Sequence, residues 1–408
     1  MFSSIYTSMS GLVAYSRGLD VISNNVSNLN TAGFKLSTLT FEDLFYQQQF
    51  ESGLGVDGQK SEFGAGVDTP GTRLSFAPGE LRETASETDV AIDGNGFFVL
   101  LGEGFDGRDT YTRAGSFEFD DDGRLVDQNG RAVAALGGGG GLEEFRIGDQ
   151  RVSPPSPTTR IELTDNLSLG SSQARIEGIE IVDSLAEVQE IDLLITNNGA
   201  TTTGSWLVEV QDADGNPLAS AGEVRFDPAG SPASGFNTVD FVFTPPNGAA
   251  PQTITIDFGE PGSFTQVTSF SGGTTSTVRF LSQDGRGNGS LVSTVFDEDG
   301  VLQLGYSNGA TEAGPQLALA WFDDLQALTQ LGEGRFQAGD AQEVRVGEAN
   351  EDVFGRIAGS TIEISNVELT DQFTELIIIQ RGFQASSQVV TTANEMLEQL
   401  IEGTRSRR

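Results

Sequence analysis

Four oxygen-bearing side chains in the middle of the chain have the spacing of a calcium-binding loop. At positions 1, 3, 5 and 12 of such a loop stand Asp212, Asp214, Asn216 and Glu223. The loop needs glycine at position 6 for its sharp turn, but this chain has Pro217 there. Asp-Gly between two strand-like runs is also a common hairpin signal. We therefore expect a hairpin turn at this place and no metal site.

Similar Asp-rich turns occur at 119–123 and 296–300, and no other group of residues points to catalysis. The pair Asp323-Asp324 could act as acid and base. In so acidic a chain, however, we expect these two carboxylates to belong to a solvated surface. Gly94-Asn95-Gly96 lacks the third glycine of a dinucleotide-binding loop. The chain has no His and no Cys, which excludes a Ser-His-Asp triad, a thiolate zinc site and a disulfide framework. We expect no enzyme activity, no cofactor and no bound metal.

The composition argues against nucleic-acid and membrane partners. Among 408 residues, 59 are acidic and 23 are basic, which gives a net charge of −36. This charge repels phosphate backbones and anionic lipids. No apolar run approaches the ~20 residues that a membrane-spanning helix needs. The start of the chain lacks the basic segment of a cleavable secretory signal, so we expect neither membrane insertion nor signal cleavage.

Both ends of the chain have the pattern of an amphipathic helix, with residues that recur every seven positions in two offset series. The N-terminal series are Ile5, Leu12, Leu19 and Val26, and Ser8, Tyr15, Ile22 and Leu29. The C-terminal series are Leu369, Leu376, Phe383, Val390 and Leu397, and Ile379, Ser386, Ala393 and Leu400. Such a repeat is typical of coiled coils. The spacing predicts helices at about 4–29 and about 366–402, the second beginning at a capping box of Ser365 and Glu368.

The charge distribution favours a chain whose two ends meet and assemble with other copies. Residues 50–365 carry nearly all of the net negative charge, whereas the ends are almost neutral. One isolated stripe would more often pack on a globular core, but two stripes at opposite ends of a β-rich chain favour pairing. A single pair would still leave apolar residues uncovered, so we expect self-assembly. The residues expected at this polymer interface are Ile5, Leu12, Tyr15, Leu19, Ile22, Val26, Leu29, Leu369, Leu376, Ile379, Phe383, Val390, Leu397 and Leu400.

The middle of the chain reads as short strands separated by Gly-, Pro- and Asp-rich turns. Breaks at 137–141, 154–157 and 259–262 suggest that one domain is inserted into another. We predict a multidomain α+β protein, with a terminal α-helical coiled-coil domain and β-rich, barrel- or sandwich-like outer domains inserted one within another. The predicted parts are a helical polymer-core domain at 1–30 and 366–408, a connecting region at 31–71, a discontinuous β-rich inner domain at 72–145 and 265–365, and a β-rich outer insert at 146–264.

Several segments resemble the rod and hook proteins of the bacterial flagellum. Residues 19–35, LDVISNNVSNLNTAGFK, closely resemble the N-terminal signature of that family. Residues 365–369, SNVEL, and 380–385, QRGFQA, resemble its C-terminal signature, although the family usually has a larger residue and Tyr where this chain has Gly382 and Phe383. Motifs of the first domain match AIDGNGFF at 91–98 and YTRAGSF at 111–117. The hook members in particular are similar to LSQDG at 281–285, YSNG at 306–309 and QLALA at 316–320.

The resemblance implies a structural subunit of the flagellar hook. Such subunits pass through the flagellar type III export apparatus and polymerise beneath a hook cap on the distal rod into a curved tube, a universal joint that carries motor torque to the filament. The expected partners are other copies of the chain, the export apparatus, the hook cap, the distal rod and the hook–filament junction proteins. The expected location is the basal body and hook, outside the cell after export. The alternatives are a distal rod or hook–filament junction component of the same family and, from another class, a secreted β-rich binding protein.

Overall fold

The computed structural model describes residues 2–44, 46–49, 61–102, 107–339 and 341–405. Part of the predicted connecting region, 50–60, and the last three residues of the chain lie outside these ranges. The described chain forms two compact units. Unit 1 consists of Met1–Gly148, Thr294–Gln303 and Ala313–Arg408, and unit 2 consists of Asp149–Ser293 and Leu304–Glu312.

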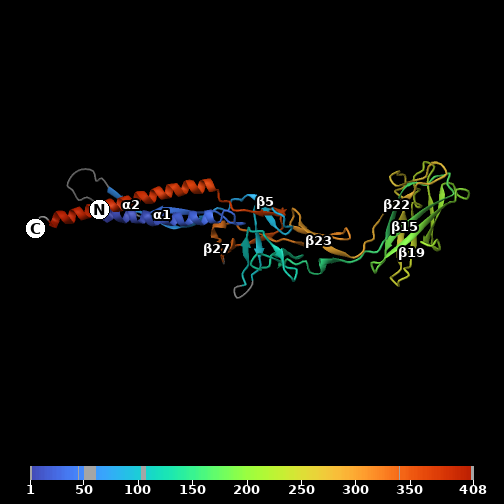
Figure 1. Cartoon of the computed structure of the whole chain (residues 1–408), viewed down its shortest axis with the longest axis horizontal. Helices are drawn as coiled ribbons and strands as arrows, with labels where there is room; N and C mark the ends of the chain where they lie inside the picture. The colour runs from blue at the N-terminus through green and yellow to red at the C-terminus, as the bar shows by residue number, and fades with distance from the viewer. Residues whose placement is uncertain (1, 45, 50–60, 103–106, 340, 406–408) are drawn as a thin grey trace. The chain divides into compact units, whose positions relative to one another are not determined.

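Two long helices, one from each end of the chain, lie side by side in unit 1 (Figure 1). Helix α1 spans Phe2–Ser27 and helix α2 spans Leu369–Arg405, so both predicted helices are confirmed. The predicted start of the second helix at 366 is wrong. Asn366 accepts a hydrogen bond from the N–H of Leu36 and donates to two carbonyl oxygens, which holds the segment before Leu369 outside the helix. Tertiary hydrogen bonds thus override the local capping signal.

An antiparallel pair of strands packs on α1. It consists of β1 (Ser37–Asp43) and β4 (Val67–Leu74), and a second pair consists of β2 (Tyr46–Gln49) and β3 (Ser61–Gly64). The side chain of Arg17 donates to the carbonyl oxygen of Thr69, and the N–H of Val67 donates to Ser10 Oγ. These contacts hold the strands against the helix.

The largest sheet of unit 1 has six strands and an aromatic core. Its order is β27 (Thr329–Gly332), β28 (Arg335–Gln337), β8 (Thr110–Thr112), β7 (Phe97–Leu100), β26 (Leu319–Trp321) and β29 (Arg345–Gly347). Phe97 stands at the centre of this core, with its ring edge-on to Phe76, Phe322 and Phe336. Edge-to-face pairs of this kind add to the free energy gained from apolar burial.

Short strand pairs occur in unit 1, two of them between segments far apart in the sequence and two within local hairpins. The pairs are β5 (Leu81–Glu83) with β31 (Thr361–Glu363), β6 (Val90–Asp93) with β30 (Arg356–Gly359), β9 (Glu118–Phe119) with β10 (Leu125–Val126), and β11 (Ala134–Leu136) with β12 (Leu142–Glu144). The 3-10 turns η1 and η2 span Gly148–Arg151 and Leu325–Ala327. A further sheet, whose residues are divided between the two units, has the order β13 (Val152–Ser153), β23 (Gly289–Phe296), β24 (Val301–Tyr306) and β25 (Thr311–Gln316). The β5–β31 and β6–β30 pairs bring the returning chain beside the outgoing one just before α2 begins.

Unit 2 consists mainly of two sheets that share one apolar core. One sheet has the order β15 (Gln173–Val182), β16 (Val188–Asn197), β17 (Ser205–Asp212) and β18 (Pro217–Arg225). The other has the order β19 (Thr238–Phe243), β20 (Gln252–Asp257), β14 (Arg160–Asn166) and β21 (Val267–Thr268), and β22 (Arg279–Gln283) also pairs with β14. Buried residues alternate with exposed ones along β19, and Trp206, Ile195 and Ile254 are fully buried in the common core.

The Asp-rich turns connect neighbouring strands, so the prediction of hairpins is confirmed. Asp212 Oδ1 accepts a hydrogen bond from the N–H of Asn216 between β17 and β18, and Asp297 Oδ1 accepts from the N–H of Val301 between β23 and β24. Glu223 lies on β18, where it contacts Ser205 and Arg225.

No helix among the described residues has the length and apolar character needed to span a bilayer.

Candidate functional site

Small residues line the contact between α1 and α2, which we call the seam. They are Gly11 and Gly18 on α1 and Gly382 and Ser386 on α2. A Cβ atom on Gly18 would come within 2.6 Å of Ile379 Cδ1, and one on Gly382 would come within 2.5 Å of the Tyr15 ring. Glycine normally weakens a helix interior. Here its missing Cβ lets the helices approach closely and leaves room for the Tyr15 ring.

Large apolar side chains remain exposed on both helices, and we call this set the outer helix face. Tyr6 is 72% exposed on α1 and Ile378 is 62% exposed on α2. The full set is Tyr6, Met9, Val13, Leu369, Phe373, Ile377, Ile378, Phe383, Val389, Met396, Leu400 and Ile401. Exposed apolar patches of this kind on a soluble protein mark sites of protein association.

The predicted interface residues fall into three groups in the structure. Ile22 and Ile379 are buried within unit 1, and Leu369, Phe383 and Leu400 belong to the outer helix face. The half-buried ones are Ile5, Leu12, Tyr15, Leu19, Val26, Leu29, Leu376, Val390 and Leu397. Heptad spacing thus selected mainly residues that the same chain already covers in part, and three of them belong to the outer helix face; their role in a polymer interface stays a prediction.

A buried polar contact joins the two helices near the end of α1. Asn25 Nδ2 donates to Gln372 Oε1 at 3.0 Å and to the carbonyl oxygen of Ser37 at 2.8 Å. The N–H of Ser37 donates back to Asn25 Oδ1 at 3.1 Å. Both side chains are almost fully buried. The contact fixes α1 relative to both α2 and the first residue of β1.

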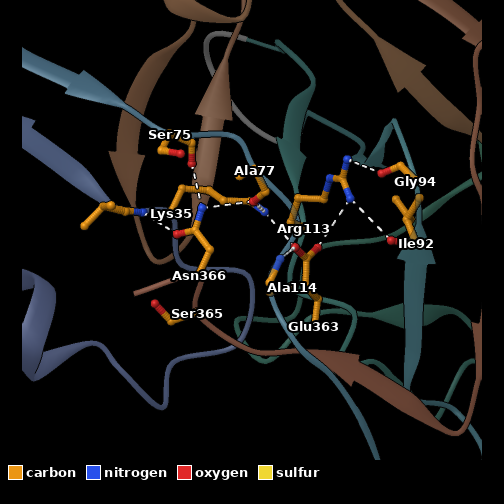
Figure 2. A network of polar contacts seen from close by, with 12 residues as sticks. Lys35, Ser75, Ala77, Ile92, Gly94, Arg113, Ala114, Glu363, Ser365 and Asn366 are labelled. Atoms are coloured by element: carbon orange, nitrogen blue, oxygen red, sulfur yellow. Dashed lines mark hydrogen bonds and ion pairs between the residues drawn. The ribbon is translucent and has the colours of Figure 1, made fainter. Parts of the chain in front are cut away.

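Glu363 binds two buried cations at the place where the segment after α1 meets the strand before α2 (Figure 2). Lys35 Nζ lies 2.6 Å from Glu363 Oε1, and Arg113 Nη1 lies 3.3 Å from Glu363 Oε2. The N–H of Gly79 donates to Oε1 at 2.7 Å. None of the three charged side chains is more than 5% exposed. We call this group the junction triad, since it joins three separate segments of unit 1.

Burial and charge act in opposite directions on the junction triad. Burial lowers the pKa of Lys35, and the neighbouring carboxylate of Glu363 opposes this shift. Burial also lowers the pKa of the Arg113 guanidinium. Carbonyl oxygens of Ala77 and Gly94 accept hydrogen bonds from the two cations and offset part of the excess positive charge. Loss of one member would leave a buried charge without its partner, so the triad holds the junction together.

Asn366 and Gly33 complete the junction through hydrogen bonds with the backbone. Asn366 Oδ1 accepts from the N–H of Leu36 at 2.7 Å, and its Nδ2 donates to the carbonyl oxygens of Ser75 and Ala77 (Figure 2). The N–H of Gly33 donates to the carbonyl oxygen of Glu363 at 2.8 Å. Gly33 has a φ of 68°, and a Cβ on it would lie 2.4 Å from the nitrogen of Ala114. Only glycine fits this close approach.

No local sequence pattern predicted the junction triad. Lys35 and Arg113 stand within the motifs at 19–35 and 111–117, and Glu363 immediately precedes the C-terminal signature. Lys35 is one of only two lysines, which is the one signal that could have drawn attention to it. Among the described residues, no group of three or more His, Cys, Asp or Glu is placed to hold a metal ion. The junction triad can hold separate segments of unit 1 together, and the outer helix face presents an apolar surface.

Three protein-family models match the chain in succession. A model described as flagella basal body rod protein matches residues 5–35, one described as flagellar hook protein FlgE/F/G D1 domain matches 91–181, and one described as flagellar basal body rod FlgEFG protein C-terminal matches 358–402. The first and last of these include Lys35 and Glu363, and the second includes Arg113.

Two of the relatives described here match the chain along almost its full length, and a third matches part of it. The flagellar hook protein FlgE of Borreliella burgdorferi is 28% identical and covers 98% of this chain and 99% of its own. FlgE of Escherichia coli is 28% identical and covers 96% of this chain and 98% of its own. FlgE of Helicobacter pylori is 42% identical over 44% of this chain and 25% of its own. A solved structure of H. pylori flagellar hook protein FlgE2 aligns with a TM-score of 0.47 at 14% identity, over 69% of this chain and 100% of that one.

Proposed function

Because the chain belongs to the flagellar hook protein family, we propose that its outer helix face packs against other copies of the chain and forms the core of the hook tube. The protein is a structural subunit of the bacterial flagellar hook, and the hook is an extracellular part of the flagellum. Membership of this family implies self-polymerisation. In this proposal, the outer helix face is the surface through which the copies polymerise.

The observation that supports this core is the row of exposed apolar side chains along both helices. Nine of the residues in this row lie on α2, and burial of each large apolar side chain is worth about 1.5–3 kcal/mol. The predicted interface residues that are half-buried, such as Leu12 and Leu397, would lose their remaining exposure if neighbouring copies covered the helices. Packing of the helices as a coiled coil with neighbouring copies follows from the same heptad spacing.

The wider role follows from the family resemblance. β-rich parts inserted one within another form the outer layers of the tube, and the tube transmits torque from rod to filament as a universal joint. The partners beyond other copies are the type III export apparatus, the hook cap, the distal rod and the hook–filament junction proteins. The near-neutral helices and the acidic remainder of the chain support this division, because charge keeps the outer parts soluble.

Adjacent residues on α2 provide a matched test of the proposed core. Ile378 is 62% exposed, whereas Ile379 is 4% exposed and lies against Gly18. Ile378→Asp should leave the circular dichroism and thermal unfolding of the monomer unchanged and abolish tubes in electron micrographs under polymerising conditions. Ile379→Ala should instead destabilise the monomer by about 2–5 kcal/mol, because it opens a cavity. Normal tubes from the Ile378→Asp protein would contradict the proposal.

A further inference from the structure

A pocket with a volume of about 470 Å³ lies within unit 1, and we call it the polar pocket. Its volume falls in the range of about 300–1,000 Å³ that is usual for small-molecule sites. Five separate segments line it: 30–32 after α1, 112–116 at the end of β8, 127–129 after β10, 333–335 between β27 and β28, and Ile362 on β31.

The junction triad and the polar pocket share the same segments. Arg113 and Glu363 belong to the triad, whereas their neighbours Thr112, Ala114 and Ile362 line the pocket. Successive residues of an extended segment point to opposite sides, which explains how two different sites form on the same backbone. The buried ion pairs on one side therefore hold the walls of the pocket on the other side in place before any ligand binds.

Arg335 lines the polar pocket and has a buried donor that the chain leaves unused. Its Nη2 lies 2.6 Å from Glu333 Oε2, and its side chain is only 13% exposed. The Nε–H of Arg335 is buried and has no hydrogen-bond partner in the described part of the chain. Because a buried donor without an acceptor costs free energy, this group indicates an acceptor that comes from outside the chain.

The turn that carries Glu333 has an unusual residue for its backbone conformation. Glu333 and Gly334 form the two-residue turn between β27 and β28, with φ angles of 55° and 69°. Turns of this kind favour Asn, Asp or Gly at both positions. The hydroxyl of Thr112 donates to the carbonyl oxygen of Gly334 at 3.0 Å and fixes the turn. Non-glycine residues held in such conformations are concentrated at ligand sites, and here the turn places the Glu333 carboxylate beside Arg335 at the pocket.

The charges of the pocket favour an uncharged ligand. Two carboxylates and one guanidinium line it, from Asp127, Glu333 and Arg335. A phosphate group would meet the two carboxylates, and a metal ion would meet the guanidinium. Among the described residues, no group of three or more acidic side chains is placed to hold a metal ion.

The neutral side chains of the pocket both donate and accept hydrogen bonds. Asn30, Gln128 and Asn129 line it with carboxamides that make no hydrogen bond within the described parts of the chain, and Ser116 adds a hydroxyl. Among the described residues of the lining, none is aromatic, so a flat ring would find no stacking partner. A matching ligand donates and accepts at several positions itself, as hydroxyl groups do.

We propose that the polar pocket binds a saccharide, a neutral ligand with many hydroxyl groups. The unused Nε–H of Arg335 donates to a sugar oxygen, and carboxylate and carboxamide oxygens accept from sugar hydroxyls. An extended peptide also offers donors and acceptors, but it binds along a free strand edge or an elongated groove, whereas turns and segment ends line this pocket. The pocket is complete within one chain, so the proposal does not depend on polymerisation.

Titration of the unassembled full-length chain tests the choice of ligand. Glucose, N-acetylglucosamine and maltose are added separately, and inorganic phosphate and Mg²⁺ serve as ionic probes. Calorimetry and saturation-transfer NMR measure binding. We expect saturable binding of at least one saccharide and of neither ion. Absence of saturable saccharide binding, or binding of an ion alone, would overturn the proposal.

Two matched pairs of variants test the place of binding. Arg335→Met removes the unused donor, and Arg345→Met changes an exposed arginine on β29 of the same sheet. We expect the first variant to lose affinity for the bound saccharide tenfold or more, and the second to keep it. Asn129→Ala, at an exposed position of the pocket, should weaken binding several-fold, whereas Asn288→Ala, exposed and outside the pocket, should not.

Circular dichroism checks the fold of each variant. If Arg335→Met does not fold, the asparagine pair decides, because both asparagines are exposed and neither side chain makes a hydrogen bond in the described parts of the chain. Equal affinities within the pair that folds would show that the saccharide binds elsewhere and would overturn the assignment of the polar pocket.

Discussion

Asn25 on α1 donates a side-chain hydrogen bond to Gln372 on α2, although 347 positions separate the two residues in the sequence. Elsewhere the helices meet through small and apolar residues, which lose no hydrogen bond if one helix shifts along the other. A buried polar pair does not tolerate such a shift, because both partners would lose their hydrogen bonds in a dry environment. Asn25 and Gln372 therefore set the register of the helix pair, and Ser37 ties that register to β1.

Gln372→Ala should destabilise the helix pair by about 1–3 kcal/mol, since it leaves one N–H of Asn25 buried without an acceptor. The measurement is urea unfolding of the monomer followed by far-UV circular dichroism, because α1 and α2 dominate the helical signal. Gln388→Ala, at an exposed position of the same helix, is the matched control and should have almost no effect. Equal losses of unfolding free energy in the two variants would show that the hydrogen bond between Asn25 and Gln372 does not stabilise the helix pair.

Glu363→Gln should cost about 3–5 kcal/mol of the unfolding free energy of unit 1, because it leaves Lys35 and Arg113 buried without their shared carboxylate. The two tryptophans allow the units to be followed separately: Trp206 lies in unit 2 and Trp321 in unit 1. Fluorescence of Trp321 in a Trp206→Phe background reports on the relevant unit. The exposed Glu118 supplies the control, and Glu118→Gln should leave the transition unchanged.

The same variant should also change how stability depends on pH. Burial lowers the pKa of Lys35, so between its folded pKa and the value near 10.5 in the unfolded chain the unfolded state binds more protons. Stability therefore rises with pH across this window. Glu363→Gln removes the carboxylate that opposes the shift, which lowers the pKa of Lys35 further and opens the window at a lower pH. Unfolding free energies measured from pH 7 to 10 should rise more steeply in the variant than in the unmodified protein, and parallel curves would argue against the ion pair.

Gly18→Ala should have opposite effects in two backgrounds. Alanine favours a helix over glycine by about 1 kcal/mol, but overpacking in a filled seam costs about 1–3 kcal/mol. The atom that a Cβ on Gly18 meets is Ile379 Cδ1, at 2.6 Å, and valine lacks this atom. We expect Gly18→Ala to destabilise the unmodified chain and to stabilise the Ile379→Val variant. A double-mutant cycle on urea unfolding measures the coupling, and additive effects would mean that the seam relaxes freely.

The sequence predicted the elements well where one physical signal dominates. Heptad spacing located both terminal helices, and Asp-Gly pairs located the hairpin turns, because each depends on residues close in the sequence. The start of α2 was misplaced because Asn366 bonds with backbone groups of residues 36, 75 and 77, which no local pattern records. The junction triad was missed for the same reason: 328 positions separate Lys35 from Glu363. Heptad counting selects few of the exposed apolar residues on the helices, because it takes no account of what the same chain already covers.

The boundaries of the inserted part also depend on distant pairing. The predicted insert at 146–264 stays a prediction, but a deletion made at those limits would remove β14 and leave β22 without the strand it pairs with. Better cut points are Ser156 and Arg286, whose backbones exchange two hydrogen bonds of 2.9 and 2.8 Å. This is the closing pair of an antiparallel hairpin, so a two-residue Asn-Gly turn can join the two residues without moving either one.

Replacement of residues 157–285 by Asn-Gly should therefore give a soluble chain in which unit 1 keeps its structure and tubes still form. The strands β13, β23, β24 and β25 all remain, and so do both helices with their outer face. The tubes should lose curvature or bending stability, since contacts between the removed segments of neighbouring copies would be absent. Electron microscopy of the assembled variant measures both, with circular dichroism as the check on folding. A folded variant that forms no tube at all would place the removed segment in the assembly core, because the helix faces alone would then be insufficient to hold copies together.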